Sequence, residues 1–292
     1  MRRLNLFPIL GAFLITSLGA PSAFAKDPIR IGLNNWAEAI AVSHMWQQVL
    51  EEKGYEVELK TVEKAILYTG LSTDAIDLAL EIWMPTTDAA YYDRFKEDID
   101  LHESWYHGAR LGLVVPAYMG IGSIEDLKDK AATFGDGRSS DGIVGIEAGS
   151  SLMEMTEQAI KAYGLDYNLM ISSEVAMISA LDRAYRQEKP VVVTLWSPHW
   201  VFAKYDLKYL EDPRNAYGAA DDIHFMSRKG FGEEYPEVLD WLNAWDMGDD
   251  SLGSLMAEVN EASSPEEGAR TWIAANRPLV DGWLESQASA QK

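Results

Sequence analysis

"PVVVTLWSPHWVFAKY", residues 190–205, is the stretch that decides the fold, and "IDLALEIWMPTTDAAYY", residues 76–92, repeats its frame. In each segment an apolar run leads into a tryptophan, a proline follows two residues later, and a tyrosine ends the segment. A run of this kind predicts a buried strand, and a proline cannot extend the hydrogen-bonded ladder of a sheet. The pattern therefore predicts two buried strands that stop at Trp83 and Trp196.

The elements around these two strands alternate between strand and helix. Strands are predicted at 29–33, 56–62 and 142–147, and helices at 37–54, 151–165 and 174–189. Such alternation is typical of an α/β sheet with parallel strands that is covered by helices on both faces. From Pro236 onward the pattern predicts helices only.

The order of the elements also predicts a division into two lobes. Two strand–helix–strand units each close with a strand that runs into Trp-x-Pro, and the extended segments 111–115 and 222–228 are suited to crossing between lobes. We expect a first lobe made of residues 26–115 together with 222–292. The second lobe, 116–221, interrupts it, and a ligand cleft lies between the two.

Three tryptophans stand where a ligand is expected. Ligands of open α/β sheets bind beyond the carboxyl ends of the strands, and Trp36, Trp83 and Trp196 all follow a predicted strand. Three indole faces around one space suit a quaternary ammonium ion, because cation–π contacts hold a cation that cannot donate hydrogen bonds. Sugars that stack on tryptophan remain an alternative at this point.

Of the other seven tryptophans, five lie in helical patterns with apolar neighbours and are predicted to pack in the core, and two stay unassigned. The five are Trp46, Trp241, Trp245, Trp272 and Trp283. The two unassigned ones are Trp105 and Trp200.

The first 25 residues have the layout of a secretory signal peptide. Two arginines precede an apolar stretch, and small residues at Ala23 and Ala25 suit cleavage after Ala25. The apolar stretch is short for a membrane span and contains Pro8, which argues against the alternative of a membrane anchor. The chain has no cysteine, so neither a lipid anchor nor a disulfide is expected. The sequence thus predicts a periplasmic, unanchored protein.

The composition restricts the partners. The formal net charge is −21, and such an acidic surface repels the phosphates of nucleic acid. No metal-spaced cluster of histidine and acidic residues is present, and we expect no cofactor. The glycine-rich "GDGRSSDG" at 135–142 lacks the Gly-Lys-Ser/Thr ending of a phosphate loop and is interpreted as a surface loop.

Several stretches together make the family recognisable. "LNNWAEAIAVSHMWQQVLEEKGYEVEL", "IWMPTTDAAYY", "LGLVVPAYM", "GIEAGSSLM" and the stretch from "VVVTLWSPHW" to "AADDIH" strongly resemble the glycine betaine-binding proteins of ABC importers. The resemblance implies a two-lobed, monomeric periplasmic binding protein that delivers its ligand to an inner-membrane permease and its ATPase. It also implies that Trp36, Trp83 and Trp196 form a three-tryptophan prism, and that backbone amides of Ser151 and Leu152 hold the ligand carboxylate.

Two positions depart from the patterns of known relatives, and a third matches one of these patterns. Asp88 stands where glycine betaine binders of the family place a histidine, and Leu111 stands where choline binders place a tyrosine. Glu38, however, matches an acid of the choline binders. Asp88 is also interpreted as a helix-start residue, with Thr86 or Thr87 as N-cap; if it faces the pocket instead, its charge opposes a ligand carboxylate. Glycine betaine leads narrowly as the expected ligand, with choline close behind.

Two other classes of function are alternatives for this chain. A periplasmic enzyme is disfavoured because the chain has no cysteine and no Gly-x-Ser-x-Gly motif. Its best catalytic candidate is His199, for which a structural hydrogen bond is the simpler role. A binding lobe of a sensor is disfavoured because no sensor domain or membrane helix accompanies the predicted lobes. We therefore expect a transport protein and no enzyme.

Overall fold

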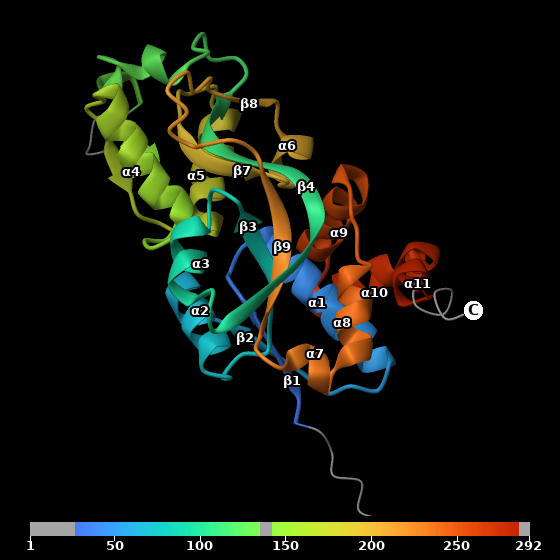
Figure 1. The fold of residues 1–292 in the computed structure, drawn as a ribbon. Coiled ribbons are helices and arrows are strands. Elements are labelled where there is room, and N and C mark those ends of the chain that lie inside the picture. The colour runs from blue at the N-terminus through green and yellow to red at the C-terminus, as the bar shows by residue number, and fades with distance from the viewer. Residues whose placement is uncertain (1–26, 135–141, 286–292) are drawn as a thin grey trace, which may run out of the picture.

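The structure is a computed structural model that describes residues 27–134 and 142–285. The predicted signal peptide and nearly all of the "GDGRSSDG" segment lie outside the described residues. One continuous mixed sheet runs through the molecule in the order β2-β1-β3-β9-β4-β7-β5-β6, and β8 pairs with β4 (Figure 1). The strands are β1 (Ile29–Leu33), β2 (Val57–Thr61), β3 (Leu78–Met84), β4 (Ile99–Pro116), β5 (Gly142–Val144), β6 (Asn168–Met170), β7 (Val193–Ser197), β8 (Leu207–Tyr209) and β9 (Asp221–Arg228).

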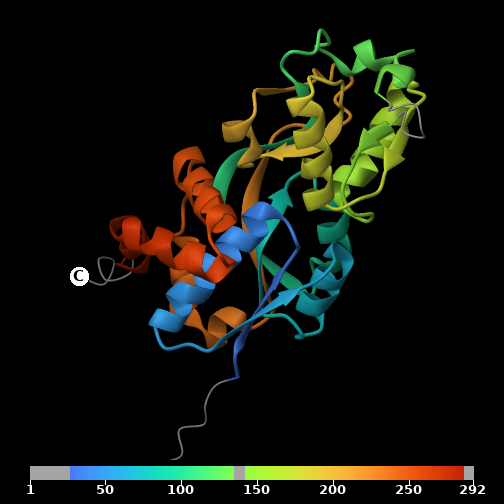
Figure 2. The same ribbon diagram turned by 180° about the vertical axis from the view of Figure 1, so that it is seen from behind.

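Helices flank both ends of this sheet. Figure 1 shows α4 and α5 beside the upper part and α1 with the C-terminal helices beside the lower part, and Figure 2 shows the same division from behind. The α-helices are α1 (Ala37–Glu52), α2 (Lys64–Ser72), α3 (Ala89–Phe95), α4 (Ser151–Tyr163), α5 (Glu174–Arg186), α6 (Val201–Lys204), α7 (Phe231–Glu234), α8 (Pro236–Asn243), α9 (Asp249–Glu261), α10 (Pro265–Ala275) and α11 (Arg277–Glu285). Short 3₁₀ helices lie at Ile124–Leu127 and Ala131–Phe134. No helix within the described ranges has the length and apolar character that a membrane crossing requires.

The strands are parallel only at the two outer parts of the sheet. β1 pairs parallel with β2 and β3, and β5 pairs parallel with β6 and β7. In the middle, β3 and β4 pair antiparallel with β9, and β4 pairs antiparallel with β7. The parallel strands predicted for the two strand–helix–strand units are confirmed. The antiparallel pairs in the middle were not predicted; they form because chain segments pass directly from one half to the other without a crossover helix.

The long strand β4 joins the two halves. Its residues Ile99 to Ala109 pair with β9, and its residues Arg110 to Val114 pair with β7. A strand of 18 residues was not expected from the sequence, where only 111–115 was assigned as extended. The polar residues between Asp100 and Arg110 hid the first half of the strand, since they interrupt the apolar run on which the prediction relied.

The two Trp-x-Pro segments adopt matching conformations. β3 ends at Met84 and β7 at Ser197, each one residue beyond its tryptophan, and the following Met84–Pro85 and Ser197–Pro198 peptide bonds are both cis. Behind Pro85, the buried carboxylate of Asp221 accepts the backbone N–H groups of Thr86 and Thr87 at 2.7 and 2.9 Å. The prolines thus end both strands, as the sequence predicted.

The core contains the five tryptophans predicted for it. Trp46, Trp241, Trp245, Trp272 and Trp283 are all buried. Trp105, which the sequence left unassigned, is buried as well and stacks on Trp245 with ring centroids 4.1 Å apart. Trp200 is only half-buried and packs against His199.

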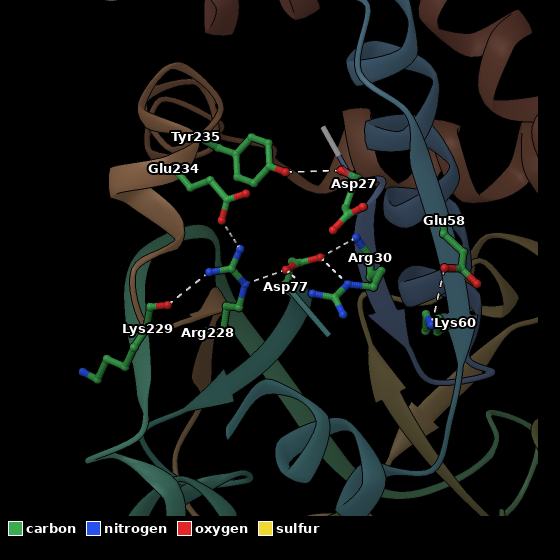
Figure 3. Close-up of polar contacts among 9 residues, drawn as sticks. All are labelled: Asp27, Arg30, Glu58, Lys60, Asp77, Arg228, Lys229, Glu234 and Tyr235. Carbon is green, nitrogen blue, oxygen red and sulfur yellow. Dashed lines mark hydrogen bonds and ion pairs between the residues drawn. The ribbon is translucent and has the colours of Figure 1, made fainter. Parts of the chain in front are cut away.

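A group of paired charges lies at the far end of the lower half of the sheet. The carboxylate of Asp77 accepts Arg30 Nε at 2.8 Å and Arg228 Nε at 2.6 Å, and Arg228 also reaches Glu234 (Figure 3). Burial works against the charge of Asp77, but the hydrogen bonds from both guanidinium groups outweigh it, so the pKa of Asp77 is lowered. We call Asp77, Arg30 and Arg228 the arginine cluster.

Candidate ligand-binding site

Trp36, which follows β1, and Trp83 and Trp196, which lie near the ends of β3 and β7, meet at one pocket between the two halves of the molecule. Trp36 and Trp196 lie with ring centroids 6.4 Å apart and ring planes at 59°, and all three indoles are buried. The pocket is lined by Trp36, Glu38, Lys64, Glu81, Trp83, Thr87, Asp88, Leu111, Ile146, Ser150, Ser151, Leu152 and Trp196. Every candidate site residue singled out in the sequence therefore lines this one pocket.

Each of these three indoles donates its N–H to a glutamate. Trp196 Nε1 donates to Glu38 at 2.8 Å, Trp83 to Glu81, and Trp36 to Glu147. The carboxylates fix the ring orientations, and their negative charge lies at the rim of rings whose faces attract cations.

Asp88 is fully buried and belongs to the pocket wall. Its carboxylate lies 2.7 Å from Lys64 Nζ, accepts the backbone N–H of Trp83 at 3.0 Å and accepts the hydroxyl of Ser151 at 3.3 Å. It is the N-cap residue of α3 but caps no amide with its side chain, so the prediction of Thr86 or Thr87 as N-cap was wrong. The carboxylate instead pairs with Lys64, which the sequence analysis did not identify as a site residue.

Lys64 changes the charge of the site. Its ammonium group is buried, pairs with Asp88, and lies 5.2 Å from the ring centroid of Trp36. Burial opposes the charge of Lys64, but the carboxylates of Asp88 and Glu81 outweigh that effect and raise its pKa. The charge of Lys64 offsets that of Asp88 and so reduces the repulsion that Asp88 would exert on a ligand carboxylate.

The N-terminus of α4 forms the other wall of the pocket. Ser150 is its N-cap residue and accepts the N–H of Met153 at 3.3 Å. The first amides of a helix, here those of Ser151 and Leu152, have no partner within the helix and can hold an anion. The resemblance to known binders placed a ligand carboxylate at these two residues, and both line the pocket.

His199 packs behind the cage. Its ring lies 4.9 Å from that of Trp196, its Nδ1 accepts the N–H of Val201 at 3.2 Å, and its Nε2 lies 3.1 Å from Glu174. These contacts assign a neutral imidazole that donates from Nε2 to the carboxylate. Glu174 also accepts the N–H of Ala37 at 3.0 Å, which caps α1. His199 thus has the structural role expected for it.

Hydrogen bonds cross the pocket from one half of the molecule to the other. Trp36 and Ala37, which begin α1, reach Glu147 and Glu174, and Trp196 reaches back to Glu38 of α1. A further contact joins Tyr91 Oη to the carbonyl oxygen of Gly149 at 3.0 Å. The two halves are therefore closed over the pocket and linked largely by carboxylates.

Sequence reasoning missed four polar residues of the site. Glu81 had a visible signal, an acid two residues before a tryptophan inside an otherwise apolar strand. Lys64, Glu147 and Glu174 had none, because each reaches the site from an element distant in the sequence.

Comparisons with known proteins identify the family and the fold. Residues 27–275 match the family described as the substrate-binding domain of the ABC-type glycine betaine transport system. A glycine betaine/carnitine transport binding protein of Listeria monocytogenes is 42% identical over 146 residues, so the match spans about half of either chain, 49% of each.

Two solved structures cover most of the chain. Lactococcal OpuAC complexed with glycine betaine is 32% identical with a TM-score of 0.81, and the alignment covers 88% of this chain and 99% of that one. An ABC-transporter choline-binding protein in complex with choline is 25% identical with a TM-score of 0.79, covering 89% and 92%. The two-lobed fold expected from the sequence is confirmed. The chain belongs to the family of substrate-binding domains of ABC-type glycine betaine transport systems.

Proposed function

We propose that this protein captures glycine betaine or a related quaternary amine and delivers it to an ABC permease and its ATPase. One observation carries the proposal: the indoles of Trp36, Trp83 and Trp196 line one buried pocket, with every indole N–H already engaged by a carboxylate. A site whose indole N–H groups are occupied offers aromatic faces and negative charge. A methylated cation needs both and requires no hydrogen-bond acceptor.

The anionic end of glycine betaine has partners in the same pocket. The amides of Ser151 and Leu152 face it from α4, and the ammonium of Lys64 faces it from α2. Asp88 stands where glycine betaine binders of the family place a histidine. In this chain Lys64 supplies the positive charge beside the ligand carboxylate. Glycine betaine is therefore our first candidate, in agreement with the ligand named for the lactococcal structure.

Choline is the second candidate, and specific acids favour it. Glu38 and Glu81 are both buried in the pocket, and a hydroxyl group could donate to either. Leu111 lines the pocket where choline binders of the family place a tyrosine, so the fourth aromatic side of their cage is absent at this position.

The remaining features follow from the transport role. We propose a periplasmic monomer that loses residues 1–25, has no lipid anchor and catalyses no reaction. We also propose lobes of residues 26–115 with 222–292 and of residues 116–221. The start of β9 at Asp221 supports the second boundary, and β4 changes its pairing partner between Ala109 and Arg110, close to the first.

Calorimetric titration tests the proposal. Glycine betaine, proline betaine, choline, carnitine and trimethylamine N-oxide are titrated into the purified protein. We expect micromolar or tighter binding of at least one, which corresponds to roughly −8 kcal/mol. Trp83→Ala and Trp196→Ala should each weaken it by about 1–2 kcal/mol or more.

Trp272→Ala is the matched control, because Trp272 is equally buried but lies in α10 outside the pocket and donates to Ser254. It should lower stability and leave the affinity of the folded fraction unchanged. Wild-type affinity in both cage variants would exclude the three-tryptophan site.

A further inference from the structure

Two acids of the pocket wall stand out because neither forms a salt bridge with any of the described residues. Glu38 of α1 and Glu81 of β3 have exposed fractions of 1% and 4%, and each accepts an indole N–H of a different cage tryptophan. The second carboxylate oxygen of Glu81, Oε2, is buried, and no N–H or hydroxyl group of the described residues donates to it. A buried carboxylate oxygen left this way is costly and indicates a partner that the contacts so far do not include.

The two carboxyl groups are each other's neighbours. Both line the same pocket, and the charge of Glu81 raises the pKa of Glu38. Two ionised carboxylates in one buried site repel each other, so a state in which the pair binds a proton is favoured over full ionisation. The pair is therefore expected to hold a proton when the pocket contains no cation.

The surrounding charges explain why the proton is held. The charged and titratable groups that face the pair are Lys64 and Tyr68 of α2, Asp88 after β3, Glu174 of α5 and His199 after β7. Lys64 is already paired with Asp88, and neutral His199 with Glu174. Burial, and then repulsion by Glu81 and Glu174, raises the pKa of Glu38 well above its ordinary value. Burial raises the pKa of Glu81 to about 7.

We propose that Glu38 and Glu81 form a proton-sharing pair that releases its proton to solvent when the ligand cation enters the cage, so that both carboxylates then face that cation. The inference rests on the proposed function, since it assumes a cationic group between Trp83 and Trp196. Proton and ligand cation are alternative counterions of the same two carboxylates. No covalent bond changes except the O–H bond that is lost.

The consequence is an affinity that depends on pH with a defined sign. Below the pKa of the pair the cation must displace a proton, and above it the carboxylates are already ionised. Affinity therefore rises with pH through the range in which the pair loses its proton, by up to about tenfold per pH unit. Neither glycine betaine nor choline gains or loses a proton in this range, so the protons come from the protein.

The test is calorimetry with glycine betaine and choline between pH 5.5 and 8.5, at each pH in two buffers that share that buffering range and differ in ionisation enthalpy. We expect proton release at pH 6.5 that decreases as the pH rises. Glu81→Gln keeps an oxygen for the Trp83 N–H but cannot ionise, so it should abolish the proton release and flatten the pH profile. Glu38→Gln should do the same, which secures the test if one variant folds poorly.

His199→Gln is the matched control, since histidine ordinarily titrates in the same pH range. Its affinity can differ from wild type, but its proton release and pH slope should persist. A flat profile in the wild type, or a slope that survives in both glutamine variants, overturns the proton-sharing pair and leaves the proposed function standing. If no quaternary amine binds at any pH, the proposed function fails and the pair's role fails with it.

Discussion

The arginine cluster and the cage acids are two buried carboxylate sites with opposite electrostatics. Asp77 is 3% exposed and Glu81 is 4% exposed, so burial alone does not separate them. Asp77 meets two guanidinium groups and has a lowered pKa, whereas Glu81 meets mainly an indole N–H and another acid and has a raised one. The first site is completed within the fold, and the second is left for a ligand cation to complete. An incomplete charge balance therefore marks the functional site.

The largest expected effect comes from breaking the completed site. Asp77→Ala leaves Arg30 and Arg228 without their shared carboxylate, and loss of one partner of a buried ion pair costs about 3–5 kcal/mol. Because Arg30 keeps 29% of its side-chain surface exposed, we expect about 2–4 kcal/mol in the free energy of unfolding. Urea denaturation measures it, and ligand affinity should not change. A loss under 0.5 kcal/mol would contradict the comparison.

The cage acids should show the opposite pH dependence of stability. The folded-state pKa of Glu81, about 7, lies above its unfolded value of 4.5, so the folded protein binds more protons than the unfolded chain between these values. The stabilisation that protonated Glu81 adds to the free energy of unfolding is complete below pH 4.5 and is lost as the pH rises through 7. The difference is up to about 3 kcal/mol. Unfolding of the ligand-free protein at pH 5 and pH 8 measures it, and Glu81→Gln should reduce the difference.

Asp77 supplies the contrast within the same experiment. Its folded-state pKa is depressed below 3.8, so its stabilising contribution is present above pH 3.8 and is lost as the pH falls through the folded value. Asp77→Asn should therefore leave the change between pH 5 and pH 8 intact. If Asp77→Asn removed the difference in stability between pH 5 and pH 8, that difference would originate in the arginine cluster.

A smaller effect is expected from Asp88→Asn, which removes the partner of Lys64. The freed ammonium should then attract a ligand carboxylate, so glycine betaine should gain on choline by about 1–2 kcal/mol. The ratio of the two dissociation constants measures this change, with Asp93→Asn on exposed α3 as control. An unchanged ratio would show that Lys64 does not contact the anionic end of the ligand.

The smallest effect should come from the exposed edge of the arginine cluster. Lys229 pairs with Asp100 at 2.6 Å, but their side chains are 51% and 41% exposed. Exposed ion pairs contribute about 0–1 kcal/mol, so Lys229→Ala should change the free energy of unfolding by less than about 1 kcal/mol. A loss as large as that of Asp77→Ala would show that burial is not what separates these pairs.

Local pattern was sufficient for the family, the two-lobed fold and the placement of the three tryptophans. A buried strand, a tryptophan and a proline lie within ten residues of one another in each frame, so a short segment contains the whole signal. Local pattern did not predict the middle of the sheet, where β4 pairs with two different strands. It also did not predict the N-cap residue of α3.

The tertiary structure alone decided the charges of the pocket. Lys64 reaches Asp88 from the preceding helix, Trp36 reaches Glu147 across 111 positions, and Trp196 reaches Glu38 across 158. The spacing of residues along the chain does not predict such contacts, because these residues meet only when the two halves of the folded molecule close. The sequence by itself determined the aromatic cage, since each tryptophan is placed by its own strand. Which carboxylates are neutralised and which await a cation depends on distances that exist only in the folded chain.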